Sequence, residues 1–525
     1  MKHIKIFDTT LRDGQQCPGA GMSFEQNIEY AHLATELGID VLEAGFPSAS
    51  KLDFEIVSKI CEEISSIKEG PIVAALCQLR DEQIDITIEA LKVAVPHNKA
   101  RLHTYVPVDP NLMEASLGSL ANDKSQIEED VYNFIKRATD AGLEVEFSPE
   151  GYSRMGSNFD FVTNLIRAAV RAGATTINCP DTIGGACRLQ GEEYFVNKMN
   201  KHAEIIAKEF PKADVTWSVH CHNDFGLAVE NSINGVIEGP ATQIEGCING
   251  VGERAGNVAL EQCILILKHF AENEEFPYKT RINTEKLKSA SDFIAKNMLP
   301  RQPHWPVIGA NSAKHSSGGH TNAILHNLNA YQPFNPSEVG QEVSFMFGPL
   351  SGGNHAKSIV EAAGYVCEDS EKAEVSQFIK ELYKERRKGI TDEELIKGYL
   401  EFRKPIRVEN FDYSRSSTSS SVCLTGKFYS KEGEIQETYE GRDSALAALK
   451  QAIDAEYPGL TIQEHKSNSD GEGFTAKSIS TIIVKDSDDE LYQGIGEDRD
   501  IEISAMKALI DAANCAFIHK NFIKE

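Results

Sequence analysis

Apolar and polar positions follow two alternating patterns over the first half of the chain. Short apolar runs typical of buried parallel strands occur at 3–8, 40–45, 72–77, 100–106, 143–148, 174–179, 214–220 and 242–247. Amphipathic stretches such as 24–37 and 160–172 lie between these runs, and Gly38, Gly142 and Gly173 follow where helices would end. About eight strand–helix units in roughly 270 residues predict a (β/α)8 barrel, an α/β fold. A doubly wound sheet is the structural alternative, because strand order cannot be read from one sequence.

Polar side chains recur where the predicted strands end. In chain order they are Arg12 and Asp13, Glu43, Gln78 and Arg80, His103, Glu150, Asp181 and Thr182, His220 and His222, then Glu245 and Asn249. In a barrel these carboxyl-terminal ends converge on one mouth. In an open sheet they would be spread along one edge, and a ligand would bind mainly at the point where the strand order reverses. The polar pattern therefore favours the barrel.

The first strand leads directly into charged residues. An apolar run beginning at Ile4 ends in Arg12, Asp13 and Gly14. A carboxylate and a guanidinium that follow a buried strand side by side lose their hydration. This loss costs free energy unless each group has a partner. A metal ion for Asp13 and a substrate oxygen for Arg12 would supply those partners. The alternative is a surface ion pair at a turn.

The segment Val219–Asp224 contains a His-Cys-His sequence at the end of a predicted strand. On extended backbone His220 and His222 point to the same face, so both could bind one ion, while Cys221 points away as a buried thiol. With Asp13 across a barrel mouth, two imidazoles and a carboxylate would leave positions open for substrate and water. This set suits Zn, Mn or Fe and, with more oxygen ligands, Mg.

A glycine-rich loop, Asn249–Asn257, follows the eighth predicted strand. Its spacing and its position late in the chain are wrong for a dinucleotide-binding GxGxxG loop. It predicts instead a tight loop whose glycines let the backbone approach a ligand. The amide oxygen of Asn257 could reach the metal from there. The alternative for Asn257 is a simple helix N-cap.

The second half of the chain has a different pattern. Helical stretches at 284–297 and 370–387 flank a segment rich in Gly, His and Ser, and its histidines (His315, His320 and His326) predict a loop laid over the site. A solvated loop is the alternative. A second loop at 351–355 could cradle phosphate, although the signal is weak by itself.

The last part of the chain contains an internal repeat. A polar segment ending in the Ser/Thr run 416–421 indicates a domain boundary. Beyond it, the helical stretches 445–453 and 503–510 each follow strand-like runs, such as 422–428 and 479–484. We predict two βββα-like halves that pair into a small α+β domain with a ligand site near their pseudo-twofold axis. The predicted domains are residues 1–275, 276–404 and 405–525.

Composition narrows the class of protein. Hydrophobic residues at 41% and charged residues at 25% are ordinary for a globular protein. The net charge of -26 argues against a nucleic-acid-binding protein, which needs a basic surface. The 11 cysteines include no CxxC, which indicates a reducing compartment. No apolar run approaches the ~18 residues of a membrane span, and the first strand leaves no room for a signal peptide, so we expect a cytoplasmic protein without a membrane partner.

Four motifs together resemble the 2-isopropylmalate synthase family. They are Asp8–Gly14, Glu43–Pro47, His220–Asp224 and Gly252–Asn257. The resemblance covers nearly the whole chain, and the C-terminal repeat is similar to that family's leucine-binding regulatory domain. Homocitrate synthase, citramalate synthase and hydroxymethylglutaryl-CoA lyase share the first motif and the His-x-His. The second motif, Leu76 before Gln78, and Ser148-Pro149-Glu150 favour 2-isopropylmalate synthase among them.

The resemblance implies a homodimeric acyltransferase that condenses acetyl-CoA with 3-methyl-2-oxobutanoate in leucine biosynthesis and is inhibited by leucine. It implies a divalent metal (Mn, Mg or Zn) held by Asp13, His220 and His222, with Asn257 near the fourth position. Arg12 would polarise the keto oxygen, and Glu150 and His320 would serve the methyl proton of acetyl-CoA. The implied keto-acid site is lined by Leu76, His103, Ser148 and Thr182.

Two segments depart from the family pattern. The lid histidine continues as His320-Thr321-Asn322-Ala323, where the family usually has His-Gln-Asp-Gly, and Ser351–Asn354 is also atypical. The identity of the base and the details of acetyl-CoA contact therefore stay open. The alternative functions are a citramalate or homocitrate synthase acting on another 2-keto acid, a carbon–carbon lyase on the same barrel, and a non-catalytic metabolite sensor.

Overall fold

The chain forms two compact units in a computed structural model that describes residues 1–271, 274–386, 388–415, 420–427, 435–441, 444–470 and 476–523. The first unit comprises Met1–Ala313 and Phe334–Val343, and the second comprises Lys314–Pro333 and Ser344–Glu525. Within the described part of the chain, no helix is both long and apolar enough to cross a lipid bilayer. The three domain ranges expected from the sequence stay a prediction.

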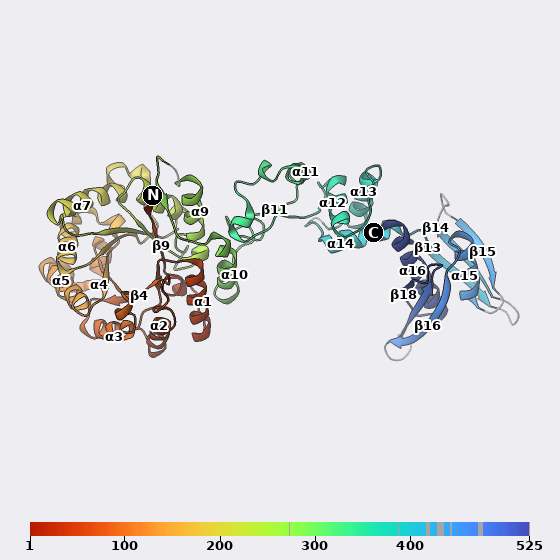
Figure 1. The fold of residues 1–525 in the computed structure, drawn as a ribbon, viewed down its shortest axis with the longest axis horizontal. Coiled ribbons are helices and arrows are strands. Elements are labelled where there is room, and N and C mark those ends of the chain that lie inside the picture. The colour runs from red at the N-terminus through yellow and green to blue at the C-terminus, as the bar shows by residue number, and fades with distance from the viewer. Residues whose placement is uncertain are drawn as a thin grey trace. The chain divides into compact units, whose positions relative to one another are not determined.

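A closed parallel barrel forms the centre of the first unit (Figure 1). Its strands, in barrel order, are β2 (Lys5–Asp8), β3 (Val41–Glu43), β4 (Ile72–Gln78), β5 (Ala100–Pro107), β6 (Glu144–Glu150), β7 (Thr176–Asp181), β8 (Thr216–Cys221) and β9 (Gln243–Gly246). Strand β2 pairs with β9 from Lys5↔Gln243 to Asp8↔Gly246, and this pairing closes the barrel. The prediction of a (β/α)8 barrel is confirmed, and the doubly wound alternative is wrong because the sheet has no free edge.

Helices surround the barrel. They are α1 (Phe24–Leu37), α2 (Lys51–Ile64), α3 (Asp81–Leu91), α4 (Pro110–Leu117), α5 (Lys124–Asp140), α6 (Phe159–Ala172), α7 (Phe195–Glu209), α8 (Ala228–Ile237), α9 (Leu260–Phe270) and α10 (Leu287–Asn297). Helices α1, α2, α4 and α5 begin at a residue whose side chain caps them. Helix α1 starts at a Ser23–Gln26 capping box and ends at Gly38, whose φ of 86° favours glycine. A short parallel pair, β1 (Lys2–His3) with β10 (Tyr278–Lys279), lies outside the barrel.

A polar layer fills the barrel near the start of its strands. Arg101 is fully buried, and its Nη1 donates to Glu146 Oε2 and to Gln243 Oε1, each at 2.9 Å. Its Nη2 donates to Glu144 Oε2 at 3.0 Å. Gln243 Nε2 donates to the other oxygen of Glu146 at 2.9 Å. The buried charges are therefore paired and hydrogen-bonded, which such charges require.

The second unit begins with short elements. These are β11 (Lys314–His315) paired with β12 (Ser344–Phe345), and helices α11 (Gly318–His326), α12 (Gly353–Ala362), α13 (Lys372–Leu382) and α14 (Asp392–Arg403). His320 and His326 thus belong to a helix, so the prediction of a loop is wrong for that part of the segment. Gly318 and Gly319, which belong to the segment rich in Gly, His and Ser, form the first turn of α11.

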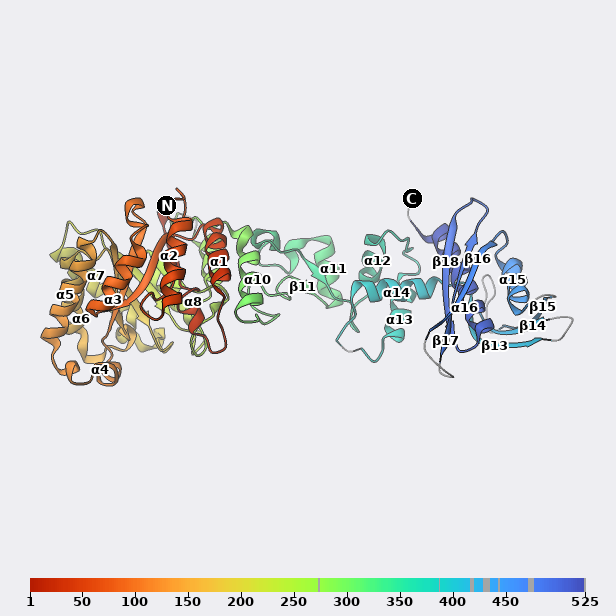
Figure 2. The same cartoon turned by 90° about the horizontal axis from the view of Figure 1, so that it is seen from below.

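Two sets of three antiparallel strands and one helix complete the second unit (Figure 2). The first set is β13 (Arg407–Arg415), β14 (Ser420–Lys427), β15 (Ile435–Gly441) and α15 (Ala445–Glu456), and the second is β16 (Thr461–Asp470), β17 (Lys477–Lys485), β18 (Leu491–Asp498) and α16 (Ile501–Phe522). Apolar residues of both sets share one core. The predicted pair of βββα halves is confirmed. Residues 416–419 of the predicted boundary, Phe428, and residues 442–443 of the repeat lie outside the described residues.

Glycines let the last helix lie against the backbone of its sheet. A Cβ atom at Gly494 would lie 2.2 Å from the carbonyl oxygen of Ala508, and one at Gly496 would lie 2.1 Å from that of Ser504. No side chain can stand between β18 and α16 at these positions. The close approach therefore depends on the two glycines.

Replacing Arg101 by alanine should destabilise the barrel. The change leaves the fully buried Glu146 without its cation, and breaking such a pair costs about 3–5 kcal/mol. Both tryptophans, Trp217 and Trp305, lie in the first unit, so their fluorescence during denaturation reports the unfolding free energy of that unit.

The matched control for this variant is Arg137→Ala. Arg137 is bonded to the exposed side chains of Asp81 and Asp85, and surface pairs contribute only about 0–1 kcal/mol. Equal losses in the two variants would contradict the importance of the buried layer.

Candidate active site

A cavity of about 260 Å³ opens at the carboxyl-terminal ends of the barrel strands. Nine of the residues singled out from the sequence line it: Arg12, Asp13, Leu76, His103, Ser148, Glu150, Thr182, His220 and His222. Six others that were not assigned to the site also line it: Gln16, Tyr105, Asn178, Pro180, Glu253 and Arg254. The first group comes from strands β2 to β8 and the turns that follow them, so the barrel brings residues as far apart as Arg12 and His222 to one cavity.

Asp13, His220 and His222 form a buried cluster at this cavity. Each offers one ligand atom, and these atoms all lie within 4.8 Å of one another. The Nε2 atoms of His220 and His222 are 3.4 Å apart, as expected for residues two apart on a strand end. Asn257 stands behind Asp13 and donates from Nδ2 to Asp13 Oδ1 at 2.7 Å. Cys221 is buried and points elsewhere, as predicted.

The polar atoms of this cluster fit a divalent cation. Glu245 Oε1 lies 2.8 Å from His220 Nδ1, which fixes that nitrogen as the donor and leaves Nε2 free to bind. Asn257 Oδ1 is buried and has no hydrogen-bond partner among the described residues. One carboxylate, two imidazoles and an amide oxygen are ligands that Zn, Mn or Fe accept.

The electrostatics of Asp13 and His222 agree with this assignment, whereas Glu245 outweighs burial and raises the pKa of His220, so this ring must lose its Nε2 proton when a cation binds. Burial and the neighbouring His220 lower the pKa of His222 to about 4, so its ring is neutral. Burial opposes ionisation of Asp13, but Arg12 and the two histidines outweigh it and hold the pKa of this carboxyl well below its usual range. A neutral imidazole and an ionised carboxylate are the forms that bind metals.

Arg12 is held at the cavity by three carboxylates. Its Nε donates to Glu43 Oε2 at 2.6 Å, its Nη1 donates to Asp13, and its Nη2 donates to Glu245 Oε1 at 3.4 Å. The side chain is 9% exposed, so one edge of the guanidinium remains at the cavity. Glu43 and Glu245 were placed at strand ends by the sequence, but their role in holding Arg12 was not foreseen.

His103 extends the network to the other side of the cavity. Its Nδ1 lies 2.7 Å from Glu43 Oε1, and its Nε2 lies 2.8 Å from Ser148 Oγ. Burial opposes protonation of His103, but Glu43 and Glu245 outweigh it and raise its pKa to about 9. Arg12 and His103 in turn lower the pKa of the buried Glu43 to about 2. The cavity therefore has two fixed cations, Arg12 and His103.

Glu150 and Thr182 lie on neighbouring strand ends. No described residue donates a hydrogen bond to the Glu150 carboxylate, and burial raises its pKa. Thr182 Oγ1 accepts from the backbone N–H of Gly151 at 2.9 Å and so fixes the turn that follows Glu150. A carboxylate with a raised pKa and no partner is suited to proton transfer.

The glycine-rich loop shapes the site from the other side. A Cβ atom at Gly252, whose φ is 150°, would lie 2.3 Å from Asn257 Nδ2 and 3.2 Å from Asp13 Oδ1. Arg254 closes the loop by donating to Thr182 O at 2.8 Å and from Nε to Asp224 Oδ1 at 2.9 Å. The N-cap of α9 is Ala259, so the alternative of Asn257 as a helix cap is wrong.

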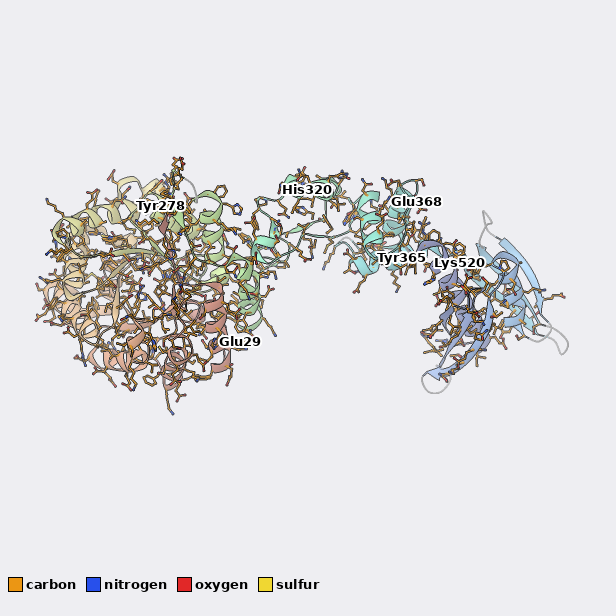
Figure 3. All side chains as sticks on the ribbon, in the orientation of Figure 1. Glu29, Tyr278, His320, Tyr365, Glu368 and Lys520 are labelled. Carbon is orange, nitrogen blue, oxygen red and sulfur yellow. The ribbon has the colours of Figure 1, made fainter. Side chains whose placement is uncertain are left out.

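His320 lies in the second unit, where Figure 3 labels it. Its ring stacks on Tyr331 with centroids 3.9 Å apart and planes at 15°. The ring of His315 lies 6.1 Å away. Its part in the chemistry stays a prediction.

His103→Gln should change how stability depends on pH. A histidine whose pKa rises from 6.5 to about 9 on folding contributes stability that is complete below pH 6.5 and is lost as pH rises through 9. The contribution is on the order of 3 kcal/mol. We expect the wild-type unfolding free energy to fall between pH 6.5 and 9 by more than that of His103→Gln. The exposed His97→Gln is the control and should follow the wild type; identical profiles for all three proteins would contradict the charged state of His103.

Comparison with known proteins agrees with this geometry. The HMGL-like family model matches residues 3–294, and the model described as homocitrate synthase post-HMGL domain-like matches residues 307–387. The 2-isopropylmalate synthase of Aquifex aeolicus is 33% identical over 99% of this chain and 97% of its own length. Those of Carboxydothermus hydrogenoformans and Oceanobacillus iheyensis are also 33% identical, over 98% and 99% of this chain and over 97% and 98% of their own lengths. The chain therefore belongs to the HMGL-like family and, within it, to the 2-isopropylmalate synthases.

Proposed function

We propose that the protein is a metal-dependent 2-isopropylmalate synthase. It condenses acetyl-CoA with 3-methyl-2-oxobutanoate, and water then hydrolyses the thioester to give 2-isopropylmalate and CoA, in the first step of leucine biosynthesis. One observation supports this above others: Asp13, His220 and His222 converge beside Arg12 at one cavity, in a chain whose full-length relatives carry that name.

Asp13, His220 and His222 would hold the divalent cation, with the amide oxygen of Asn257 beside them. When bound, the cation supplies Lewis-acid polarisation of the keto group. Arg12 stabilises the negative charge that develops on the keto oxygen. Because three carboxylates already fix its guanidinium, no reorganisation is needed during the reaction.

The remaining residues bind the keto acid and move the proton. Glu150 removes a proton from the methyl group of acetyl-CoA, and the resulting carbon nucleophile forms the new bond to the keto carbon. The Ser148 hydroxyl, which His103 Nε2 contacts at 2.8 Å, would donate to an oxygen of the keto acid beside the His103 charge, and Leu76 and Thr182 complete its site. We assign His320 to the acetyl-CoA side of the reaction by its resemblance to the family's lid histidine.

We further propose a cytoplasmic homodimer that is inhibited by leucine through the C-terminal repeat. The ten cysteines whose thiols are described form no disulfide, which supports a reducing compartment. The two βββα sets share one core, as a paired ligand-binding domain would. The proposed division is a catalytic barrel at 1–275, a linker region at 276–404 and a regulatory domain at 405–525.

A homocitrate or citramalate synthase is the second candidate. The match of residues 307–387 to a family model named after homocitrate synthase favours a different 2-keto acid, and the atypical Ser351–Asn354 segment lies within it. A lyase or a metabolite sensor would use the same barrel without producing CoA from acetyl-CoA and a keto acid.

The decisive assay measures release of the CoA thiol from acetyl-CoA with a panel of 2-keto acids, with and without leucine. We expect the highest kcat/KM on 3-methyl-2-oxobutanoate and a lower rate when leucine is present. Highest activity on pyruvate would identify a citramalate synthase, and on 2-oxoglutarate a homocitrate synthase. No release with any keto acid in the presence of Mn, Mg or Zn would contradict all three synthases.

His222→Ala should lose metal and turnover together while the barrel stays folded. Removing one of three protein ligands should lower kcat by about 100-fold or more, since even outer partners of a metal site contribute 10–100-fold. Metal content by atomic spectroscopy, kcat and circular dichroism test this. His32→Ala, a half-exposed histidine on α1, is the matched control and should keep both properties. Undiminished metal stoichiometry in His222→Ala would show that His222 is not a ligand.

A further inference from the structure

Trp305 belongs to the segment that follows the barrel, but its indole contacts the barrel itself. Its Nε1 donates to Glu261 Oε1 at 2.8 Å. Glu261 lies in the first turn of α9 and is fully buried. Its second oxygen, Oε2, accepts from the backbone N–H of Asn249 at 3.1 Å. One buried carboxylate thus joins Trp305 to the start of the glycine-rich loop.

The start of that loop is also packed against the indole. A Cβ atom at Gly250 would lie 3.3 Å from Trp305 Cζ2, so the ring lies directly over Gly250. Asn249 has a positive φ of 61° and is fixed by donating from Nδ2 to Ser291 O at 2.8 Å. Both residues are therefore held by groups outside the barrel strands.

The same loop carries the amide next to the cation site. The carbonyl oxygen of Gly250 accepts from the backbone N–H of Asn257 at 3.0 Å. Asn257 Nδ2 donates to Asp13 Oδ1 at 2.7 Å and to Val251 O at 3.0 Å. Continuous contacts thus run from Trp305 through Glu261 and Gly250 to Asn257 and Asp13.

Trp305 sits in a strained turn close to where the chain passes into the second unit. Val307 has φ 70°, which a β-branched residue rarely adopts. A Cβ atom at Gly309 would lie 2.5 Å from Trp305 O and 2.6 Å from Pro303 O, so residues 303–309 are tightly folded. Gln341, just before the return at Val343, donates to Gly309 O at 2.9 Å and accepts from Ser312 Oγ at 3.1 Å. The turn therefore anchors the chain on both sides of its passage into the second unit.

We propose that Trp305 is a positioning residue for Asn257 and, through it, for the cation site at Asp13. This inference rests on the proposed function only in taking Asp13, His220 and His222 as the cation ligands. When the turn at 303–309 holds the indole against Gly250, the amide oxygen of Asn257 is fixed beside the cluster. A displacement of the turn would remove the contacts of Glu261 and Gly250 and loosen the site. The segment leading to the second unit can thus modulate metal affinity without touching the metal.

Linkage makes the coupling reciprocal. If a docked indole strengthens cation binding, bound cation must favour the docked indole by the same factor. Trp305 and Trp217 are the two tryptophans of the chain, so the emission of Trp305 can be observed alone in a Trp217→Phe background.

The test is the affinity of the full-length protein for Mn²⁺, measured from free Mn²⁺ by electron paramagnetic resonance. Trp305→Phe keeps an aromatic ring but removes the N–H donor and part of the contact with Gly250. We expect Mn²⁺ to bind about 10-fold more weakly, the lower end of the effect of groups bonded to metal ligands, because Trp305 acts on Asn257 only through Gly250 and Glu261. The neighbouring exposed His304→Ala is the control and should bind as the wild type does. A purely structural role would lower the melting temperature and leave the Mn²⁺ dissociation constant unchanged, which would overturn the proposal.

Glu261→Gln is a second variant for the case that Trp305→Phe does not fold. It changes the carboxylate that joins Trp305 to Asn249 and should also weaken Mn²⁺ binding.

Fluorescence gives a second measurement. In Trp217→Phe, the emission of Trp305 should change saturably with Mn²⁺, and His222→Ala should abolish that change. Unchanged emission, with Mn²⁺ bound, would overturn the positioning role alone. Absence of stoichiometric Mn²⁺ binding in the wild type would overturn the metal assignment of the proposed function as well.

Discussion

The rest of the site depends on the three ion pairs that hold Arg12. A buried guanidinium is stable only if its charge and its hydrogen-bond donors are matched, and Asp13, Glu43 and Glu245 together meet that need. Each of these carboxylates also has a second task. Asp13 belongs to the cluster with His220 and His222 that could hold a metal ion. Glu43 contacts His103, and Glu245 contacts His220. The cationic groups and the proposed metal ligands are therefore parts of one network that spans β2, β3, β5, β8 and β9.

The barrel was predictable because its signals are local and repeated. Apolar runs and amphipathic stretches recur at regular intervals, and polar groups recur at the strand ends. Closure was predicted only indirectly, from the polar strand ends, because the pairing of Lys5 with Gln243 that closes the barrel joins residues far apart in the chain. Arg101 shows the same limit. In the sequence it is one charged residue in a strand, and only the closed barrel brings Glu146 and Gln243 to it.

The candidate site was predictable where residue type and spacing already imply chemistry. His220 and His222 share a strand face, and Asp13 follows a strand that ends in charge, so their meeting followed from the barrel. Asn178 carries no such signal. It is one asparagine in an apolar strand, although its Nδ2 donates to both Ser148 Oγ and Glu245 Oε2 at 3.0 Å. The role of Trp305 was equally hidden, because an aromatic residue in a loop normally indicates packing alone.

Gly252 constrains how enzymes of this kind can diverge. Any side chain there would collide with Asn257 and crowd Asp13, whatever keto acid is bound. Position 252 is thus unavailable for tuning substrate choice, although Glu253 and Arg254 of the same loop line the cavity. On the cavity wall contributed by β4 to β7, Leu76, Tyr105 and Pro180 are not among the proposed cation ligands, so a change of size there leaves that set intact. A change of substrate would then keep Gly252 and alter the side chains contributed by β4 to β7.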